Sequence, residues 1–337
     1  MPVHPDVAAR FHYLDGLTSL RDAYADEVLV RQIRQFESWE PAQPPPAVDT
    51  RGASAPGAHG PVPVRIYTPS GDLRTGAPGL VPLPVHSPSR DVPAGAPGLV
   101  WLHGGGFVGG DLDMREADWT AREVCARAGA VVVSVDYRLA AGGVHYPVPH
   151  DDTVAAVAWV RDHSGDLGID SARITIGGAS AGGNLTAGAA VKLRDRDGWV
   201  PAALVLVYPA LHPRTPAPSA SLAAALAELP PLFQPAGDGN PVEENYLGGP
   251  LSSADGYAFA ANAILDGLCP SLVLNAEFDR LRASGEAFTA AAALAGVDIR
   301  QVTVRGMLHG FLNLPAEVTP VCQCLDLIAG TVAKGGL

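Results

Sequence analysis

The stretch "RITIGGASAGGNLTAGAAVKL", residues 173–193, decides the fold of this chain. "RITI" is a β-branched run with the length of a buried strand, and "GNLTAGAAVKL" has the composition of a helix. Between them only small residues flank Ser180, with glycine at 178 and 182. A strand–Gly-x-Ser-x-Gly–helix order is typical of a sharp elbow that holds a nucleophilic serine in a strained conformation with its hydroxyl exposed.

From residue 98 onward, short apolar runs alternate with helix-like segments. The runs are "GLVWL" (98–102), "AVVVSV" (130–135), "RITIG" (173–177), "AALVLVYP" (202–209), "SLVLNA" (271–276) and "IRQVTV" (299–304). This alternation predicts an α/β fold, with a mostly parallel central sheet and helices on both faces. In such folds, ligands bind beyond the carboxyl ends of the strands.

Two regions lie outside that alternation. Before it, residues 5–40 have helical periodicity, 41–61 form a Pro-, Ala- and Gly-rich linker or loop, and 62–69 alternate as a half-buried strand. An irregular loop is expected over 70–96, where "GAPGLV" at 76–81 recurs at 95–100 by local duplication or by chance. The alternation from residue 98 onward is itself interrupted at residues 210–265, which combine an Ala-rich helix with the loop "QPAGDGNPVEENYLGG". This interruption indicates an insertion over the sheet.

The composition limits the classes of partner. The chain has 337 residues, of which 47% are hydrophobic, so it is long enough for a sizeable core. A formal net charge of −12 without a basic cluster argues against nucleic acid and anionic membranes. No signal segment or membrane span is recognisable, so a cytoplasmic protein is expected. Four cysteines do not indicate a disulfide scaffold or a metal site, and Cys125 and Cys269 are expected to be buried.

A serine nucleophile needs a base and an orienting carboxylate, which follow the elbow in the order acid, then histidine. His309, between glycines in "VRGMLHGF" after the last apolar run, is the candidate base, whereas His212 is expected to cap or face solvent. Asp279 in "EFDRLR" is the candidate acid, and Glu277 is the second choice. The alternatives are a surface histidine and a carboxylate that caps a helix or pairs with a nearby arginine.

The glycines of "WLHGGGFVGG", residues 101–110, follow an apolar run. Bare backbone N–H groups at such a place can stabilise the negative oxygen of a tetrahedral intermediate. The N–H groups of Gly105, Gly106 and Ala181 are the candidate oxyanion hole, and His103 is expected to brace the loop. The loop lacks the Lys-Ser/Thr ending of a phosphate-binding loop, which argues against nucleotide binding.

These segments together resemble the hormone-sensitive-lipase branch of α/β-hydrolase esterases, the bacterial family IV. The matching stretches include "LVWLHGGGFVGGDLD", "VVSVDYRLA", "YPVPHDD", "GGASAGGNL", "VYP", "LNAEFDRLRASGEAF" and "GMLHGF", in the family's order over residues 60–335. The resemblance implies Ser180 as nucleophile, Asp279 as acid and His309 as base. It also implies a catalytic domain (46–209 and 266–337) under a helical cap (1–45 and 210–265).

The implied function is hydrolysis of carboxylic esters of short to medium acyl chain, without cofactor or metal. Amide or lactone hydrolysis by the same residues stays open. So does a ligand-binding protein like the plant gibberellin receptor, although the presence of His309 counts against it. Candidate pocket walls, which can equally be core, are Phe107, Trp119 and Tyr208. An exposed last strand suggests a homodimer.

Three departures from the family pattern concern the surroundings of the site. Ala179 stands where the family has an acidic residue before the nucleophile. The stretch "DYRLAAGGVHYP" lacks the family's Pro-Glu and is one residue longer, and Arg280 replaces a proline after the candidate acid. No candidate catalytic residue is lost, but the subfamily and the natural substrate stay open.

Overall fold

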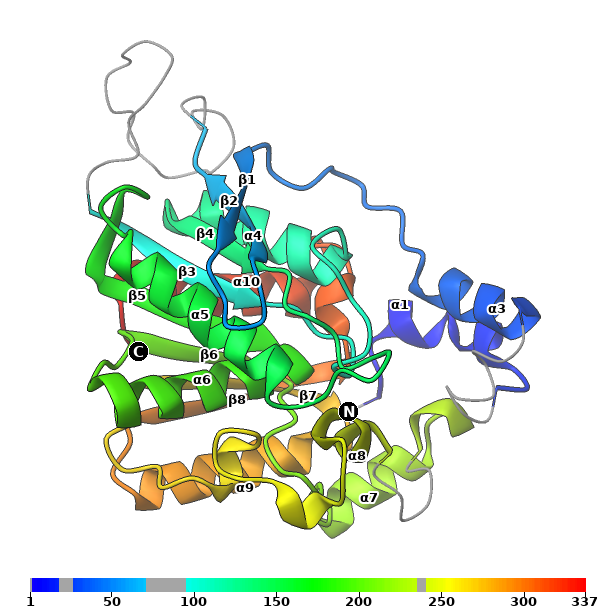
Figure 1. The fold of residues 1–337 in the computed structure, drawn as a ribbon. Coiled ribbons are helices and arrows are strands. Elements are labelled where there is room, and N and C mark those ends of the chain that lie inside the picture. The colour runs from blue at the N-terminus through cyan, green and yellow to red at the C-terminus, as the bar shows by residue number, and fades with distance from the viewer. Residues whose placement is uncertain (1, 18–26, 71–94, 235–240) are drawn as a thin grey trace.

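The computed structural model of the chain describes residues 2–17, 27–70, 95–234 and 241–337 (Figure 1). Its strands are β1 Asp49–Ala55, β2 Val62–Thr68, β3 Ala96–Leu102, β4 Val131–Val135, β5 Ile169–Ala179, β6 Ala203–Val207, β7 Ser271–Phe278 and β8 Ile299–Leu308. Its helices are α1 Pro5–Ala8, α3 Glu27–Glu37, α4 Arg115–Ala128, α5 Val148–Asp162, α6 Ala181–Asp197, α7 Ala220–Ala227, α8 Pro241–Leu247, α9 Arg282–Leu294 and α10 Thr319–Lys334. Short 3-10 turns are η1 Phe11–Leu14, η2 Pro231–Phe233, η3 Leu251–Ser253, η4 Ala260–Asn262 and η5 Phe311–Asn313.

The described strands form a single sheet in the order β1-β2-β4-β3-β5-β6-β7-β8. Neighbouring strands from β4 to β8 in this order are parallel. The pairs β1–β2 and β2–β4 are antiparallel. Every apolar run predicted as a strand from residue 98 onward lies in one of them, so the predicted α/β fold with a mostly parallel sheet is confirmed. Strands β4 and β6 are buried along their whole length because helices cover both faces.

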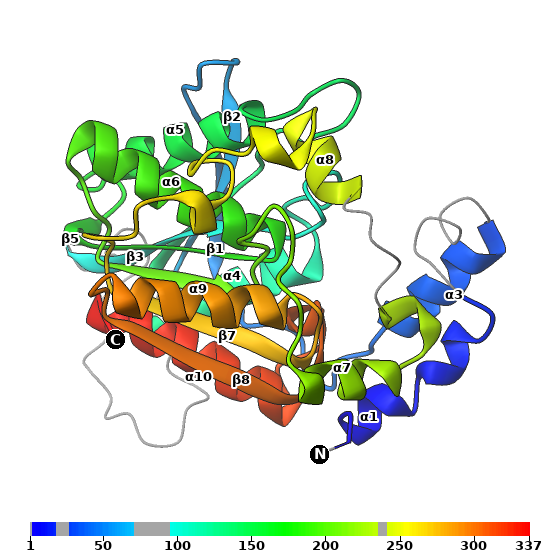
Figure 2. The same cartoon turned by 90° about the horizontal axis from the view of Figure 1, so that it is seen from below.

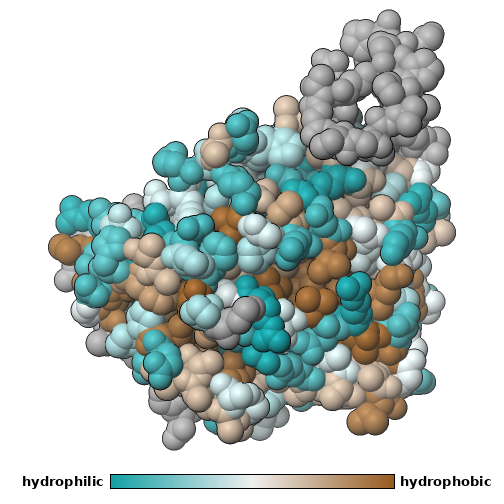
Figure 3. Space-filling view, turned by 180° about the vertical axis from the view of Figure 1, so that it is seen from behind, coloured by the Kyte–Doolittle hydropathy of each residue, from teal (hydrophilic) through white to brown (hydrophobic). Residues whose placement is uncertain are grey.

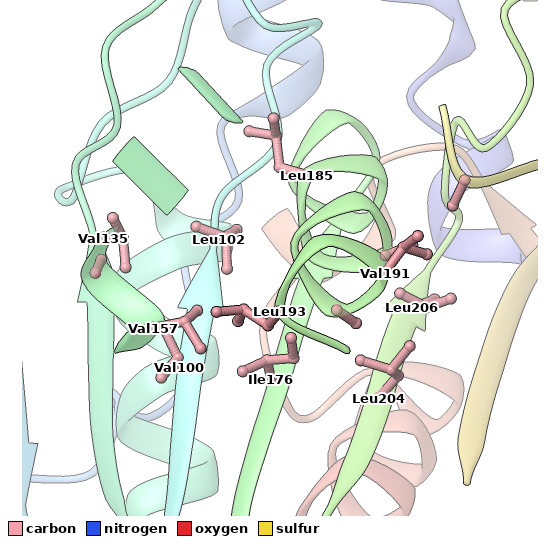
Figure 4. Packing of buried hydrophobic residues seen from close by; sticks show 14 of the residues in the cluster. Val100, Leu102, Val135, Val157, Ile176, Leu185, Val191, Leu193, Leu204 and Leu206 are labelled. Atoms are coloured by element: carbon pink, nitrogen blue, oxygen red, sulfur yellow. The ribbon is translucent and has the colours of Figure 1, made fainter. Parts of the chain in front are cut away.

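Two hydrophobic layers hold the helices to the sheet. On one face, α5, α6 and α9 cover strand side chains such as Val100, Ile176 and Leu204. Figure 4 shows Leu193 of α6 beside Ile176. On the other face, α4 and α10 pack against each other and against the sheet (Figures 1 and 2). Burial on both faces fixes the strand ends rigidly, and these ends carry the loops discussed below.

Two elements lie where the sequence predicts loops. Strand β1 falls within the predicted 41–61 linker; it is an edge strand, exposed along most of its length, so it lacks the apolar alternation of a strand. Helix α8 falls within the predicted loop after residue 234, begins at Pro241 and buries Tyr246 and Leu247. With seven residues it is too short to show helical periodicity in the sequence. The predicted 70–96 loop lies almost entirely outside the described residues.

The N-terminal segment contacts part of the 210–265 insertion. The ring centroids of Phe11 in η1, Phe36 in α3 and Phe233 in η2 lie within 6.4 Å of one another. Figure 2 shows α1, α3 and α7 grouped on one side of the molecule. Residues 258–260 instead belong to the hydrophobic core between α6 and the sheet. Asn184 Nδ2 of α6 donates to the carbonyl oxygen of Ala258. Only part of the predicted insertion therefore lies with the N-terminal helices, and the cap as a domain stays a prediction.

The face opposite to that in Figure 1 is mixed: hydrophobic residues form separate patches among hydrophilic ones (Figure 3). In the described part of the chain, no helix is long and apolar enough to cross a membrane. All four cysteines are described and free, and the predicted burial of Cys125 and Cys269 is confirmed.

Candidate active site

Ser180 joins β5 to α6 and has an unusual backbone conformation, with φ 54° and ψ −116°. Non-glycine residues with positive φ in the described chain are Phe107, Ser180 and Tyr208. All three lie at the carboxyl edge of the sheet, on the loops that surround the serine. Because such conformations cost about 1–3 kcal/mol each, their concentration marks the functional edge of the molecule.

Two glycines make the elbow possible. A Cβ at Gly182 would lie 2.1 Å from the carbonyl oxygen of Leu102 and 2.4 Å from that of His103. A Cβ at Gly178 would lie 2.5 Å from the backbone of Gly182. The elbow thus presses directly against the end of β3, which brings the serine next to the glycine loop.

The structure brings Ser180, His309 and Asp279 into one hydrogen-bonded series. His309 follows β8 and Asp279 follows β7, so both stand at the same sheet edge as the elbow. The distance from Asp279 Oδ2 to His309 Nδ1 is 2.7 Å, and that from His309 Nε2 to Ser180 Oγ is 2.9 Å. With Nδ1–H donating to the carboxylate, Nε2 is left to accept the serine proton.

Hydrogen-bond partners distinguish Asp279 from Glu277, the second candidate acid. One carboxylate oxygen of Glu277 accepts the backbone N–H of Gly306 at 2.7 Å, and the other accepts Arg305 Nη1 at 2.7 Å. Burial raises the pKa of Glu277, but these two donors outweigh it and hold the pKa below its usual value. Glu277 therefore supports the strand before His309, and Asp279 is the carboxylate at the imidazole.

The glycine loop after β3 lies beside the elbow and contains backbone donors without an acceptor in the described chain. Gly105 and Gly106 have φ of 120° and 61°, and a Cβ at Gly105 would lie 2.0 Å from the carbonyl oxygen of Gly109. Among the described residues, the backbone N–H groups of Gly105, Gly106 and Ala181 have no hydrogen-bond acceptor. They are suited to receive a negatively charged oxygen.

His103 braces this loop, as predicted. Its Nδ1 lies 2.7 Å from the carbonyl oxygen of Gly104, and its ring stacks on Tyr137, whose hydroxyl donates to the His103 carbonyl oxygen. Burial lowers the pKa of His103, which favours the neutral ring. His212, the other histidine after the elbow, is half-buried, with Nδ1 2.8 Å from Ser284 Oγ rather than in solvent.

The three predicted pocket residues lie in different surroundings. Tyr208 is 4.9 Å from the His309 ring, so the structure brings it to the site. Phe107 is buried and stacks on Tyr246 of α8 at 3.9 Å, which makes its ring part of the packing. Trp119 lies in a separate cleft of about 240 Å³, between residues 41–45 and the α4–α10 layer. No described contact joins Trp119 to Ser180.

Sequence reasoning missed Glu116, in the first turn of α4. Its carboxylate is 1% exposed and accepts Gly104 N–H at 2.7 Å and Trp101 Nε1–H at 2.9 Å. Burial raises the pKa of Glu116 to about 7. An acidic residue in a helix's first turn is ordinarily a surface feature, so the sole sequence signal was its position shortly after the glycine loop.

The chain is similar to a known protein family and to named esterases. Residues 99–313 match the model of a family described as the alpha/beta hydrolase fold. The carboxylic ester hydrolase LipN of Mycobacterium tuberculosis is 32% identical over 313 residues, covering 91% of this chain and 74% of that protein. The carboxylesterase NlhH of the same organism is 34% identical over 66% of this chain and 69% of its own. A hyperthermophilic esterase from the archaeon Pyrobaculum calidifontis superposes with a TM-score of 0.78, at 28% identity over 99% of both chains.

Proposed function

This chain belongs to the alpha/beta hydrolase fold family, in its hormone-sensitive-lipase-like branch, and hydrolyses carboxylic esters; we propose that Ser180, His309 and Asp279 carry out the reaction on esters of short to medium acyl chain. The observation that carries the assignment is the hydrogen-bonded series of these three side chains, beside three unused backbone donors. About a third of the His309 side chain is exposed, which leaves the reacting atoms open to a substrate.

In the proposed reaction, Ser180 Oγ attacks the ester carbonyl carbon while His309 Nε2 takes its proton. Asp279 holds the imidazole in the required tautomer and stabilises the imidazolium. The carbonyl oxygen becomes negative and accepts the N–H groups of Gly105, Gly106 and Ala181. The imidazolium then protonates the leaving alkoxide, and an acyl-enzyme remains on Ser180.

Water completes the cycle by the same groups. His309 Nε2 takes a proton from the water, whose oxygen attacks the acyl carbon, and a second tetrahedral intermediate forms in the same donor set. Its collapse returns the proton to Ser180 and releases the acid. The buried ring of Tyr208 beside the His309 ring supports a limit on acyl length. The residues that choose the ester are proposed to lie in the cap.

The test is turnover of p-nitrophenyl esters from acetate to palmitate by the wild type and by Ser180→Ala. Ser284→Ala is a matched control, because Ser284 is also a buried serine hydrogen-bonded to a histidine. We expect a maximum at short or medium chains, loss of turnover in Ser180→Ala and near-wild-type rates in Ser284→Ala. A wild type that neither cleaves these esters nor is labelled at Ser180 by a phosphonate would contradict the proposal and favour ligand binding. Labelling without ester turnover would favour an amide or lactone substrate.

Two further features are proposed for the molecule. A cytoplasmic location is supported by four free cysteines, which suit a reducing compartment. A homodimer through β8 is supported by the position of that strand at the sheet edge. Light scattering after size exclusion would measure the mass of one chain or of two.

A further inference from the structure

Glu116 stands out among the buried acids that the reaction does not use. It has no Lys or Arg partner within the described residues, and its two carboxylate oxygens are taken up by N–H groups of Trp101 and Gly104. A buried carboxylate without a cation is costly, and hydrogen bonds to the charged group offset that cost. A buried carboxylate of this kind can fix the position of the backbone whose N–H groups it accepts.

What Glu116 holds is the start of the glycine loop. Gly104 directly precedes Gly105 and Gly106, whose N–H groups are the proposed oxyanion donors. The position that a Cβ of Gly104 would occupy lies 3.3 Å from Glu116 Oε2, 3.4 Å from the carbonyl oxygen of Ala179 and 3.5 Å from Ser180 Cβ. Gly104 therefore lies next to both the Glu116 carboxylate and the elbow.

The backbone of Glu116 connects this arrangement to the base. Its N–H donates to Asn313 Oδ1 at 3.2 Å, and Asn313 Nδ2 donates to the carbonyl oxygen of Gly310 at 3.1 Å. Gly310 directly follows His309. One residue at the start of α4 thus ties the glycine loop through its side chain and the histidine loop through its main chain.

We propose that Glu116 is a positioning residue for the oxyanion hole, setting the direction of the Gly105 and Gly106 N–H groups through its hydrogen bond to Gly104 and their distance from His309 through Asn313. The proposal rests on the proposed ester hydrolysis. Glutamine cannot replace the carboxylate fully, because it has one acceptor oxygen where two N–H groups approach, and its amide would set a donor against a donor.

The experiment measures the transition state separately from the ground state. An alkyl trifluoromethyl ketone adds to Ser180 Oγ, whose proton passes to His309 Nε2, and the ketone oxygen becomes an oxyanion in the hole. Its inhibition constant is compared with kcat and KM for p-nitrophenyl acetate in the wild type, Glu116→Gln and Asn313→Ala. Asp152→Asn is the matched control: a buried carboxylate of α5 that accepts a backbone N–H and an arginine, with no described hydrogen bond of its own to the glycine loop.

We expect Glu116→Gln to lower kcat about 10- to 100-fold and to weaken ketone inhibition by a similar factor, with KM within about threefold, because the lost interaction acts in the transition state. Asn313→Ala is expected to lower both about 3- to 10-fold. Asp152→Asn is expected to lose stability without changing the ketone constant.

A folded Glu116→Gln protein that binds the ketone as tightly as the wild type would overturn the proposal. If that variant does not fold, Asn313→Ala decides, and a wild-type kcat and ketone constant there would overturn it. Wild-type protein that shows neither ester turnover nor ketone binding would overturn the proposed function instead, so the two failures are distinguishable.

Discussion

The two sides of the proposed active site each contain a supporting carboxylate, and these carboxylates lie in opposite electrostatic settings. On the base side, formed by the ends of β7 and β8, Glu277 meets Arg305 and the Gly306 N–H, and Asp279 meets His309. On the oxyanion side, formed by the end of β3 and the start of α4, Glu116 meets only N–H groups of neutral residues.

The difference appears in how readily each acid holds a proton. The Gly306 N–H and Arg305 outweigh burial and lower the pKa of Glu277, whereas burial without a cation raises the pKa of Glu116 to about 7. The hydrogen-bond and charge partners of a buried carboxylate therefore decide whether it is charged throughout the neutral pH range.

The largest effect is expected from breaking the base side at Asp279. Asp279→Asn leaves the shape but removes the charge that orients and stabilises the imidazolium, so we expect kcat on p-nitrophenyl acetate to fall about 10⁴-fold. Glu277→Gln, two residues away, is the matched variant and should cost less than about tenfold. A larger loss in Glu277→Gln than in Asp279→Asn would reverse the two roles.

Gly182→Ala is expected to disrupt the contact between the elbow and the end of β3 on the oxyanion side. The new Cβ meets the carbonyl oxygens of Leu102 and His103, so the elbow and the glycine loop must move apart. We expect a fall in kcat of about 100- to 1000-fold, comparable to the loss of an oxyanion donor. Gly165→Ala, whose Cβ meets nothing within 4 Å, is the control. Retained activity in Gly182→Ala would show that the contact between elbow and loop is dispensable.

The pH dependence of stability compares the two sides directly. The folded-state pKa of Glu116, about 7, lies above its ordinary 4.5, so its contribution to stability is full below pH 4.5 and lost as pH rises toward 7, a change of about 3 kcal/mol. The lowered pKa of Glu277 has the opposite sign: its contribution is present above its ordinary pKa and lost on acidification.

Urea unfolding from about pH 3 to about pH 8 measures this contrast. The free energy of unfolding of the wild type minus that of Glu116→Gln should decrease as pH rises from 4.5 to about 7. The same difference for Glu277→Gln should increase as pH rises toward 4.5 and change little above it. Parallel slopes for the two variants would show that the electrostatic contrast between the two sides is absent.

The smallest effect is expected from Phe233→Ala, which touches neither side. Loss of the ring loosens its contact with Phe11 and Phe36, so KM for butyrate and longer esters should change about two- to fivefold. The acetate kcat should stay within about twofold. Ile264→Ala, at an exposed side chain, is the control. An equal loss of kcat on all esters would mean that the cap acts on the reacting groups themselves.

Much of this arrangement is predictable from local sequence. The parallel strands, the elbow around Ser180 and the glycine loop depend on patterns within about ten residues: β-branched runs, and glycines where a Cβ would meet backbone. The position of His309 after the last strand follows from chain order. Strand β1 escaped prediction because an exposed edge strand has no buried face to impose alternation.

What the sequence determined by itself is the sheet, its loops and the order serine, acid, histidine, since strand, turn and helix signals are local. The sequence left Glu277 as a second choice of acid, and tertiary structure excluded it, because Glu277 accepts from Gly306 and Arg305 while Asp279 lies at the imidazole. Tertiary structure also decided that Glu116 lies buried under the glycine loop, and that Phe233 meets residues about 200 positions earlier. Pairings between distant segments depend on how helices and strands pack, and that packing is a property of the whole core.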